Sequence, residues 1–225
     1  MKAYQIRIEL ADSDPLIWRR VVMPAGATFY RLHQVIQTVT NFRECHLFAF
    51  ELPDDNLRVT NDEEAYEERL HYKKHWKEIE QKMEEAGSEF AEMQRMQLQQ
   101  LRTVIRKPSG IKVDSYLEKY GTIAYTYDYG DGWTFSIILE DERDDHYYVY
   151  PVLIDGAETA PPEDVGGLPG FYEFLTTYYD TTHPDHDDVT AWAQEQLFRE
   201  YNPDFINSML KFVMYKKTEW DKLNG

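Results

Sequence analysis

Two short segments of the chain combine carboxylates with turn-forming residues. Asp128 and Asp131 lie in a glycine-containing turn, and Glu163 and Asp164 lie in a loop rich in proline and glycine. Clustered carboxylates bind hard cations such as Mg²⁺, and a bound cation can position phosphates or activate water. This pattern predicts that the four side chains meet around a divalent cation. The competing interpretation is local, because such carboxylates also accept backbone N–H bonds in turns and cap the segment that follows.

A second group combines histidine with acids near the C-terminal end. His183 and His186 are three residues apart and stand among Asp185, Asp187 and Asp188. Two imidazoles at this spacing can reach one ion within a helical turn, and carboxylates can complete the ligand set. The alternative is a solvated loop before a helix, with Asp187 or Asp188 as the N-cap.

Aromatic residues surround the first carboxylate pair. Tyr125, Tyr127 and Tyr129 alternate along one face of an expected strand, and Trp133 follows the turn. Such a row can stack bases or line a peptide groove, or it can be the core side of the strand. Together with the carboxylates, it gives a predicted binding surface made of Tyr127, Asp128, Asp131, Trp133, Glu163 and Asp164.

Several other kinds of site are not expected. The chain has no phosphate-binding glycine-rich loop and no nucleophile elbow. Cys45 is the single cysteine, which excludes a disulfide within the chain. Cys45 and His46 are adjacent in an expected strand, so their side chains should point apart. We therefore expect no cysteine–histidine nucleophile pair.

The compartment can be inferred from the same residues. A single cysteine suits a reducing environment. The N-terminal residues mix charged and apolar types, unlike a signal peptide, and no segment approaches the ~18 apolar residues of a membrane span. The sequence predicts a cytoplasmic protein without membrane contact.

The negative charge is concentrated in one part of the chain. Residues 120–210 hold 19 acidic residues against Arg143 and Arg199, which accounts for the whole net charge of −17. The remaining 22 acidic and 22 basic residues cancel. An acidic surface repels phosphate backbones, so this part is expected to prefer a basic protein or peptide, and any nucleic acid should bind elsewhere. Acidic surfaces also simply aid solubility.

Hydrophobic periodicity indicates a mixture of strands and helices. Two early strands form a predicted hairpin, and a helix begins near Thr28. A glycine-bracketed turn joins two further strands into a second hairpin. The expected strands are 4–10, 16–23, 46–52, 122–129, 133–140 and 147–154; the expected helices are 29–41, 171–179, 190–201 and 205–215. Hairpins rather than βαβ units predict a single α+β domain over residues 1–225, with a mainly antiparallel sheet and packed helices.

Residues 61–106 differ from their surroundings in being dominated by charge. Apolar residues recur there every three or four positions from Trp76 to Met93, a heptad-like stripe. Gly87-Ser88 interrupts the stripe, and this pair can end one helix and cap the next. We expect a helical hairpin inserted into the domain, with one long helix as the alternative.

Several strings resemble the plasmid pRiA4b ORF-3-like family in order and spacing. They include Trp18-Arg19-Arg20, Leu32-His33-x-x-Ile36-Gln37, His46-Leu47-x-x-Phe50, Tyr125-x-Tyr127-Asp128-Tyr129-Gly130-Asp131-Gly132-Trp133, Pro161-Pro162-Glu163-Asp164-Val165-Gly166-Gly167-x-x-Gly170-Phe171, His183-Pro184-Asp185-His186-Asp187-Asp188 and Asn202-Pro203-Asp204-Phe205. The resemblance covers nearly the whole chain outside residues 61–106.

The resemblance implies an association with plasmids and insertion elements but no particular activity. The resolvase-like label sometimes given to the family finds no serine-recombinase arrangement in these residues. Family members often carry a histidine where this chain has Phe135, and cysteines where it has residues such as Leu153 and Val165. If those positions bind a metal in relatives, this chain lacks that site.

Three functions follow as hypotheses. The first is a non-enzymatic binding or accessory module that recognises a basic partner through the acidic and aromatic surface. The second is a divalent-metal-dependent hydrolase, acting for example on phosphodiesters, which uses Asp128, Asp131, Glu163 and Asp164 or the His183/His186 group. The third is a nucleic-acid binder that uses a basic surface outside residues 120–210. The module and the enzyme differ in a measurable way, because only the enzyme needs its carboxylates around a shared ion.

Overall fold

The fold is an eight-stranded sheet with helices along one face, seen in a computed structural model that describes residues 1–85 and 102–213. The strand order is β5-β4-β3-β6-β7-β1-β2-β8, and every pair is antiparallel except β4–β5. The strands are β1 Ala3–Leu10, β2 Trp18–Pro24, β3 Phe48–Leu52, β4 Leu57–Thr60, β5 Val104–Arg106, β6 Thr122–Tyr127, β7 Trp133–Arg143 and β8 Val152–Ala157. The predicted α+β class with a mainly antiparallel sheet is confirmed.

Period-two alternation explains why these segments form strands. In β1, Tyr4, Ile6, Ile8 and Leu10 are all buried, while the residues between them are partly exposed. Both predicted hairpins form, because β1 pairs with β2 and β6 pairs with β7. Each fully buried Ile or Leu side chain stabilises the fold by about 1.5–3 kcal/mol.

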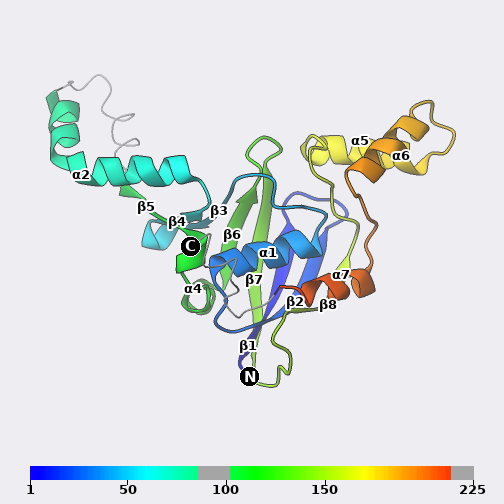
Figure 1. Ribbon diagram of the computed structural model, residues 1–225, viewed down its shortest axis with the longest axis horizontal. Coiled ribbons are helices and arrows are strands. Elements are labelled where there is room, and N and C mark those ends of the chain that lie inside the picture. The colour runs from blue at the N-terminus through cyan, green and yellow to red at the C-terminus, as the bar shows by residue number, and fades with distance from the viewer. Residues whose placement is uncertain (86–101, 214–225) are drawn as a thin grey trace.

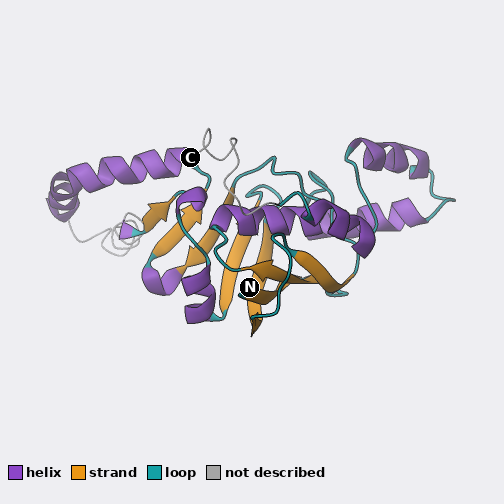
Figure 2. Ribbon diagram, turned by 60° about the horizontal axis from the view of Figure 1, so that its bottom comes forward, coloured by secondary structure: helices purple, strands orange, loops and turns teal. Residues whose placement is uncertain are grey.

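The helices are α1 Phe29–Val39, α2 Glu63–Glu85, α4 Asp114–Tyr120, α5 Gly167–Tyr179, α6 His186–Glu195 and α7 Pro203–Leu210, with short 3-10 turns η1 Pro53–Asp55 and η3 Pro108–Gly110. Helices α1 and α7 lie across one face of the sheet, whereas α2 extends beyond one end of it and α5 and α6 beyond the other (Figure 1 and Figure 2). In α1, Thr28 caps the N-terminus as expected, since its Oγ1 accepts from the N–H of Arg31 at 3.3 Å. Asn202 caps α7 in the same way, accepting from Phe205.

The region 61–106 begins as predicted and ends differently. α2 occupies its first half and leaves helical geometry only at His75. Val104–Arg106 is strand β5, parallel to β4, rather than helix, because the segment completes the edge of the sheet. The second arm of the predicted hairpin, with Gly87 and Ser88, lies outside the described residues.

The bounds of one strand and one helix also differ from those predicted. The strand expected at 147–154 is shifted along the chain to Val152–Ala157, and the helix expected at 190–201 begins earlier, at His186. α5 and α6 pack through aromatic rings, with Phe174 in edge-on contact with Trp192 and Phe198. Among the described residues, no helix combines the length and the apolar character needed to cross a membrane.

Three loops meet at one end of the sheet. They are the α1–β3 loop, residues 40–47; the β6–β7 turn, residues 128–132; and the β8–α5 loop, residues 158–166. Direct bonds join them: the N–H of Asp128 donates to Leu47 O at 2.9 Å, and the N–H of Gly166 donates to Asp131 Oδ2 at 3.1 Å. This end of the sheet therefore brings together residues that are far apart in sequence.

Candidate metal centre

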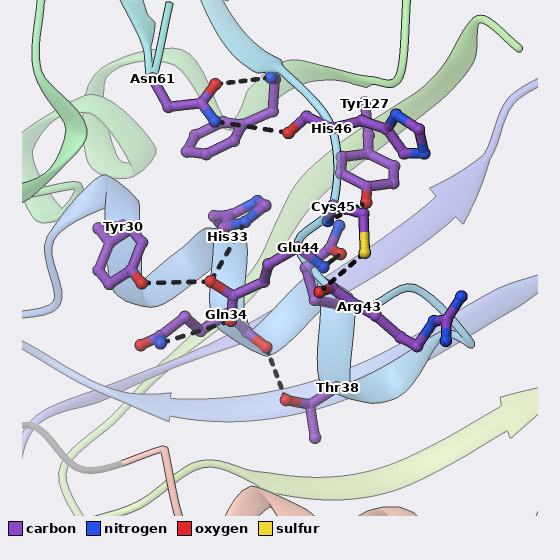
Figure 3. A network of polar contacts seen from close by, with 12 residues as sticks. Tyr30, His33, Gln34, Thr38, Arg43, Glu44, Cys45, His46, Asn61 and Tyr127 are labelled. Atoms are coloured by element: carbon purple, nitrogen blue, oxygen red, sulfur yellow. Dashed lines mark hydrogen bonds and ion pairs between the residues drawn. The ribbon is translucent and has the colours of Figure 1, made fainter. Parts of the chain in front are cut away.

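The α1–β3 loop places His46 at the meeting point of the three loops. Asn61, just after β4, holds the backbone on either side of Leu47: its side-chain NH₂ donates to His46 O at 3.4 Å, and its Oδ1 accepts from the N–H of Phe48 at 2.8 Å. Glu44, which has a positive φ of 58°, donates its N–H to Gln37 Oε1 at 2.8 Å. Figure 3 shows this network, in which the imidazole of His46 lies beside Tyr127.

Asp128 is held in a left-handed conformation, with φ of 53°, at the start of the β6–β7 turn. Its Oδ1 accepts from the N–H of Gly130 at 2.9 Å, and its backbone O accepts from Gly132 at 2.7 Å. Turn chemistry thus uses one carboxylate oxygen, as the local interpretation expected. The other oxygen, Oδ2, lies 3.8 Å from His46 Nε2.

Glu163 is a fully buried carboxylate. Its Oε1 accepts from the backbone N–H of Arg43 at 2.6 Å and from the hydroxyl of Tyr127 at 2.7 Å. Its Oε2 has no hydrogen-bond partner, although it lies 3.6 Å from His46 Nε2. Burial and the neighbouring Glu163 raise the pKa of Tyr127, which keeps the phenol protonated as a donor.

Asp164 completes the group from the exposed side. It also has a positive φ, 55°, and its Oδ1 lies 3.2 Å from His46 Nε2, the shortest of the three carboxylate contacts. Its side chain is 61% exposed and that of His46 is 29% exposed, so the group is open to solvent on one side. Four residues from the three loops thus form a cluster that we call the loop centre: His46, Asp128, Glu163 and Asp164.

The spacing of the loop centre suits a shared cation. Ligand atoms of His46, Asp128 and Asp164 all lie within 4.8 Å of one another, and within the described chain they are the one such group of three or more. Ligands about 2.0–2.2 Å from one tetrahedral ion are roughly 3.3–3.6 Å apart. One imidazole nitrogen can share a proton with a single carboxylate, whereas three carboxylates face it here. A cation held by His46, Asp128 and Asp164 would balance these negative charges.

Asp131 plays a different part from the one predicted. Its Oδ2 accepts from Gly166, so it ties the turn to the β8–α5 loop and is not one of the clustered ligands. Gly167 has a φ of 69°, and a Cβ there would lie 3.1 Å from Asp131 O. At Gly170 a Cβ would lie 2.0 Å from Val165 O, so only glycine fits. The structure thus brings Asp128, Glu163 and Asp164 together around His46 and places the Asp131 carboxylate apart from them, against Gly166.

The predicted aromatic surface is also wrong at its two central residues. Tyr127 and Trp133 are buried, 0% and 2% exposed, because the row of tyrosines faces the helices. The alternative interpretation, that the row is the core side of the strand, is confirmed for Tyr125 and Tyr127. Tyr129 is exposed and pairs with Arg58, its hydroxyl accepting at 2.8 Å.

His183 and His186 do not face a common point. The ring Nδ1 of His183 accepts from the N–H of Asp185 at 3.2 Å, and the ring of His186 turns toward Thr177 O at 3.2 Å. Both imidazoles therefore serve the turn and the packing at the start of α6. The N-cap expected at Asp187 or Asp188 is wrong, because α6 begins at His186 with Asp185 in the cap position. Neither belongs to a group of three close ligands within residues 1–85 and 102–213.

Sequence reasoning missed His46, the residue at the middle of the loop centre. It was expected in a strand beside Cys45, yet β3 begins only at Phe48, so His46 belongs to a loop. The signal that could have found it is the string His46-Leu47-x-x-Phe50, which carries part of the family resemblance without having a structural explanation of its own.

Comparison with known proteins gives one matching family and two similar proteins. The family described as Plasmid pRiA4b ORF-3-like protein matches residues 2–209. The "Uncharacterized protein y4hQ" of Sinorhizobium fredii (strain NBRC 101917 / NGR234) is 28% identical over 189 residues, which cover 84% of this chain and 79% of that protein. A crystal structure titled "Protein of Unknown Function MM3350 from Methanosarcina mazei Go1" superposes with a TM-score of 0.60 at 25% identity, covering 90% of this chain and 96% of that one.

Proposed function

The chain belongs to the plasmid pRiA4b ORF-3-like protein family, and from that premise we propose that it is a metal-dependent hydrolase with a single divalent cation at the loop centre. One observation carries the proposal. The buried atoms His46 Nε2 and Glu163 Oε2 face each other at 3.6 Å, and neither has a hydrogen-bond partner. Buried polar atoms are almost always hydrogen-bonded, so His46 Nε2, which faces three carboxylates without a hydrogen bond, points to a cation held with Asp128 and Asp164. Glu163 Oε2, beside it, is then free to bond a water on that cation.

Roles for the four side chains follow from their positions. His46, Asp128 and Asp164 are the three mutually close ligands, which is the usual number of protein ligands in a catalytic site with one open position. A bound cation would lower the pKa of a water molecule at that position. Glu163 has one oxygen fixed by Tyr127 and Arg43 and the other free, so it is placed to accept the proton of that water.

The ligand types favour particular ions. Three carboxylates alone would suit Mg²⁺ or Ca²⁺, whereas an imidazole nitrogen favours Mn²⁺, Fe²⁺ or Zn²⁺. We therefore expect Zn²⁺ and Mn²⁺ to bind more tightly than Mg²⁺ and Ca²⁺. This preference would separate the loop centre from an ordinary acidic surface, which binds all divalent ions weakly.

The charge around the loop centre bears on the substrate. The ligand carboxylates come from the acidic part of the chain, and enzymes that transfer phosphoryl groups surround the phosphate with Arg, Lys or several metal ions. A neutral or cationic ester or amide suits the loop centre better than a phosphodiester. The basic protein or peptide expected as a partner fits the same charge, as the substrate of this centre.

The first experiment is a thermal melt of metal-stripped protein with and without Zn²⁺, Mn²⁺, Mg²⁺ and Ca²⁺. An ion at 100 times its Kd adds about 2.7 kcal/mol, which raises Tm by about 5–10 °C for a chain of this size. Asp128→Asn should remove the rise for Zn²⁺ and Mn²⁺. Asp131→Asn is the matched control and should keep most of it, because Asp131 contacts Gly166 rather than the ligands.

Hydrolysis is tested separately with chromogenic esters and amides of neutral, cationic and anionic types. Glu163→Gln preserves the acceptor for Tyr127 and Arg43 but cannot take a proton. We expect it to keep metal binding and to lose at least about 100-fold in rate, the contribution of a positioned general base. Absence of a Tm rise with every ion would contradict the metal centre; a rise without hydrolysis of any substrate would leave a metal-binding protein and contradict the hydrolase.

A further inference from the structure

A second site lies near the opposite edge of the sheet, between α2, β4, β5, η3 and α4. An open cavity of about 740 Å³ is lined there by residues from all of these elements. Cavities of roughly 300–1,000 Å³ are the size that binds small organic molecules. None of its lining residues belongs to the loop centre or to the acidic part of the chain.

The walls of the cavity are apolar and aromatic. Leu57 and Val104 come from the paired strands β4 and β5, and Tyr66 and Tyr116 come from α2 and α4. Tyr116 is fixed by ring contacts with centroids at 5.6 Å to Phe29, edge-on, and at 6.5 Å to Tyr120. A planar ring entering the cavity therefore meets a tyrosine whose position is already set, which lowers the entropic cost of binding.

The charges at the cavity do not cancel. Lys107 is paired with Glu63 at 3.2 Å and lies over the ring of Tyr66, and Asp55 is paired with Lys119. Arg106 is exposed and lines the cavity, yet within the described part of the chain its guanidinium has no ion pair or hydrogen bond. The N–H donors of this guanidinium, whose arrangement suits a planar or tetrahedral anion, are therefore available to a ligand.

A smaller hollow adjoins the first. It has a volume of about 200 Å³ and shares Lys107 and Ser109 with the larger cavity. Its other walls include the side chains of Thr60 and Asn61, the carboxylates of Asp62 and Glu63, and Tyr30. The larger cavity therefore offers aromatic and apolar groups with Arg106, Lys107 lies where the two meet, and the smaller hollow offers polar and acidic groups.

We propose that this cavity binds a small anion that carries a planar ring, of the nucleoside phosphate class. The ring would pack against Tyr66 and Tyr116, and the phosphate would accept hydrogen bonds from the guanidinium of Arg106. The smaller hollow would hold the sugar. A bare anion would use only Arg106, and an uncharged ring would leave that group unused. The site also agrees with the charge distribution, because it lies in the part of the chain whose charges balance.

The test is isothermal titration of the full chain with AMP, adenosine and inorganic phosphate, all in excess EDTA. The chelator prevents phosphate from binding through a cation at the loop centre, so the result does not depend on the proposed hydrolase. We expect AMP to bind with a Kd between about 1 μM and 1 mM, and adenosine and phosphate to bind at least about tenfold more weakly, because each lacks one set of contacts.

Three substitutions test which residues form the binding site. Arg106→Gln should weaken AMP at least about tenfold, since it removes the charge-assisted bonds, and Tyr66→Leu should weaken AMP and adenosine alike. Arg143→Gln is the matched control, a partly exposed arginine at the end of β7, and should bind AMP like the wild type. No AMP binding at 5 mM, which is about five times the weakest Kd expected, or equal behaviour of Arg106→Gln and Arg143→Gln, would overturn the proposal. Phosphate binding as tightly as AMP would also overturn it.

Discussion

Tyr125 and Tyr127 of β6 each belong to a polar cluster, and the two clusters differ in one respect. Tyr125 belongs to what we call the α1 cluster, where its hydroxyl bonds His33 Nδ1 at 2.7 Å and accepts from Gln37 at 3.2 Å. Tyr127, two residues on, belongs with the loop centre, where its hydroxyl bonds Glu163 and the N–H of Cys45. Both hydroxyls are fully paired, but only the loop centre leaves an imidazole and a carboxylate without partners.

The difference separates a structural histidine from a functional one. His33 is 2% exposed and stacks on Phe48 with ring centroids 3.7 Å apart, so packing and one hydrogen bond explain its presence. His46 is partly exposed, and among the described residues its Nε2 has three carboxylates near it but no hydrogen bond. Unsatisfied buried groups cost free energy, and they persist where a ligand satisfies them. The α1 cluster should therefore govern stability, and the loop centre should govern metal affinity.

The largest effect is expected from His46→Ala. Partners that only orient metal ligands contribute 10–100-fold to affinity, so loss of the single nitrogen ligand should raise the Kd for Zn²⁺ by at least about 1,000-fold, or about 4 kcal/mol. Its effect on the free energy of unfolding without metal should stay within about 0.5 kcal/mol, as for other partly exposed loop residues. Competition titration with a zinc chelator measures the Kd for Zn²⁺, and urea unfolding measures the free energy of unfolding. Unchanged zinc affinity would remove His46 from the centre.

The reverse pattern is expected from His33→Ala. This change leaves a cavity beside Phe48 and deprives the Tyr125 hydroxyl of a buried partner, so unfolding in urea should become easier by about 2–4 kcal/mol. Zinc affinity, measured below the unfolding transition, should stay within about twofold of the wild type. A large loss of affinity together with a small loss of stability would show that the two clusters are not separate.

The tyrosines offer a closer comparison, because each can lose only its hydroxyl. Tyr127→Phe removes the acceptor of the N–H of Cys45, which adjoins the ligand His46, and should weaken zinc binding by about 10–100-fold, the range for groups that orient ligands. Tyr125→Phe, equally buried, should leave zinc affinity unchanged and reduce stability by about 1–2 kcal/mol. Titration and urea unfolding of both variants, side by side, measure this. Equal zinc affinities for the two would contradict the assigned role of Tyr127.

The sequence could predict most of the sheet, because alternation and turn chemistry are local. The segments 122–129 and 133–140, with the glycines between them, contain all the information needed for a hairpin. Local patterns could not place Val104–Arg106, however. This segment is a strand because it pairs with the edge strand β4, and that edge exists only once the sheet has folded.

The loop centre was only partly predictable for a related reason. The loop carboxylates could be found from their types, but which of them converge depends on backbone conformation. Positive φ at Asp128 and Asp164 places both among the residues that face His46, whereas Asp131, in the same turn, bonds Gly166. His46 itself depends on Glu44 and Asn61, which shape its loop through tertiary contacts. No periodicity in the sequence encodes these contacts.

The smallest expected effect is the response of the α1 cluster to pH. Burial lowers the pKa of His33 to about 3, below its ordinary value of 6.5. Folding thus favours the neutral imidazole, so this contribution to stability is complete above pH 6.5 and declines as pH falls toward 3. The slope can reach about 1.4 kcal/mol per pH unit, although Glu44, 3.8 Å from the ring, opposes it by attracting the charged form. Urea unfolding at pH 7, 6 and 5 should show a steeper decline for wild type than for His33→Gln. Parallel declines would mean that water reaches His33, and would remove the contrast between the two histidines.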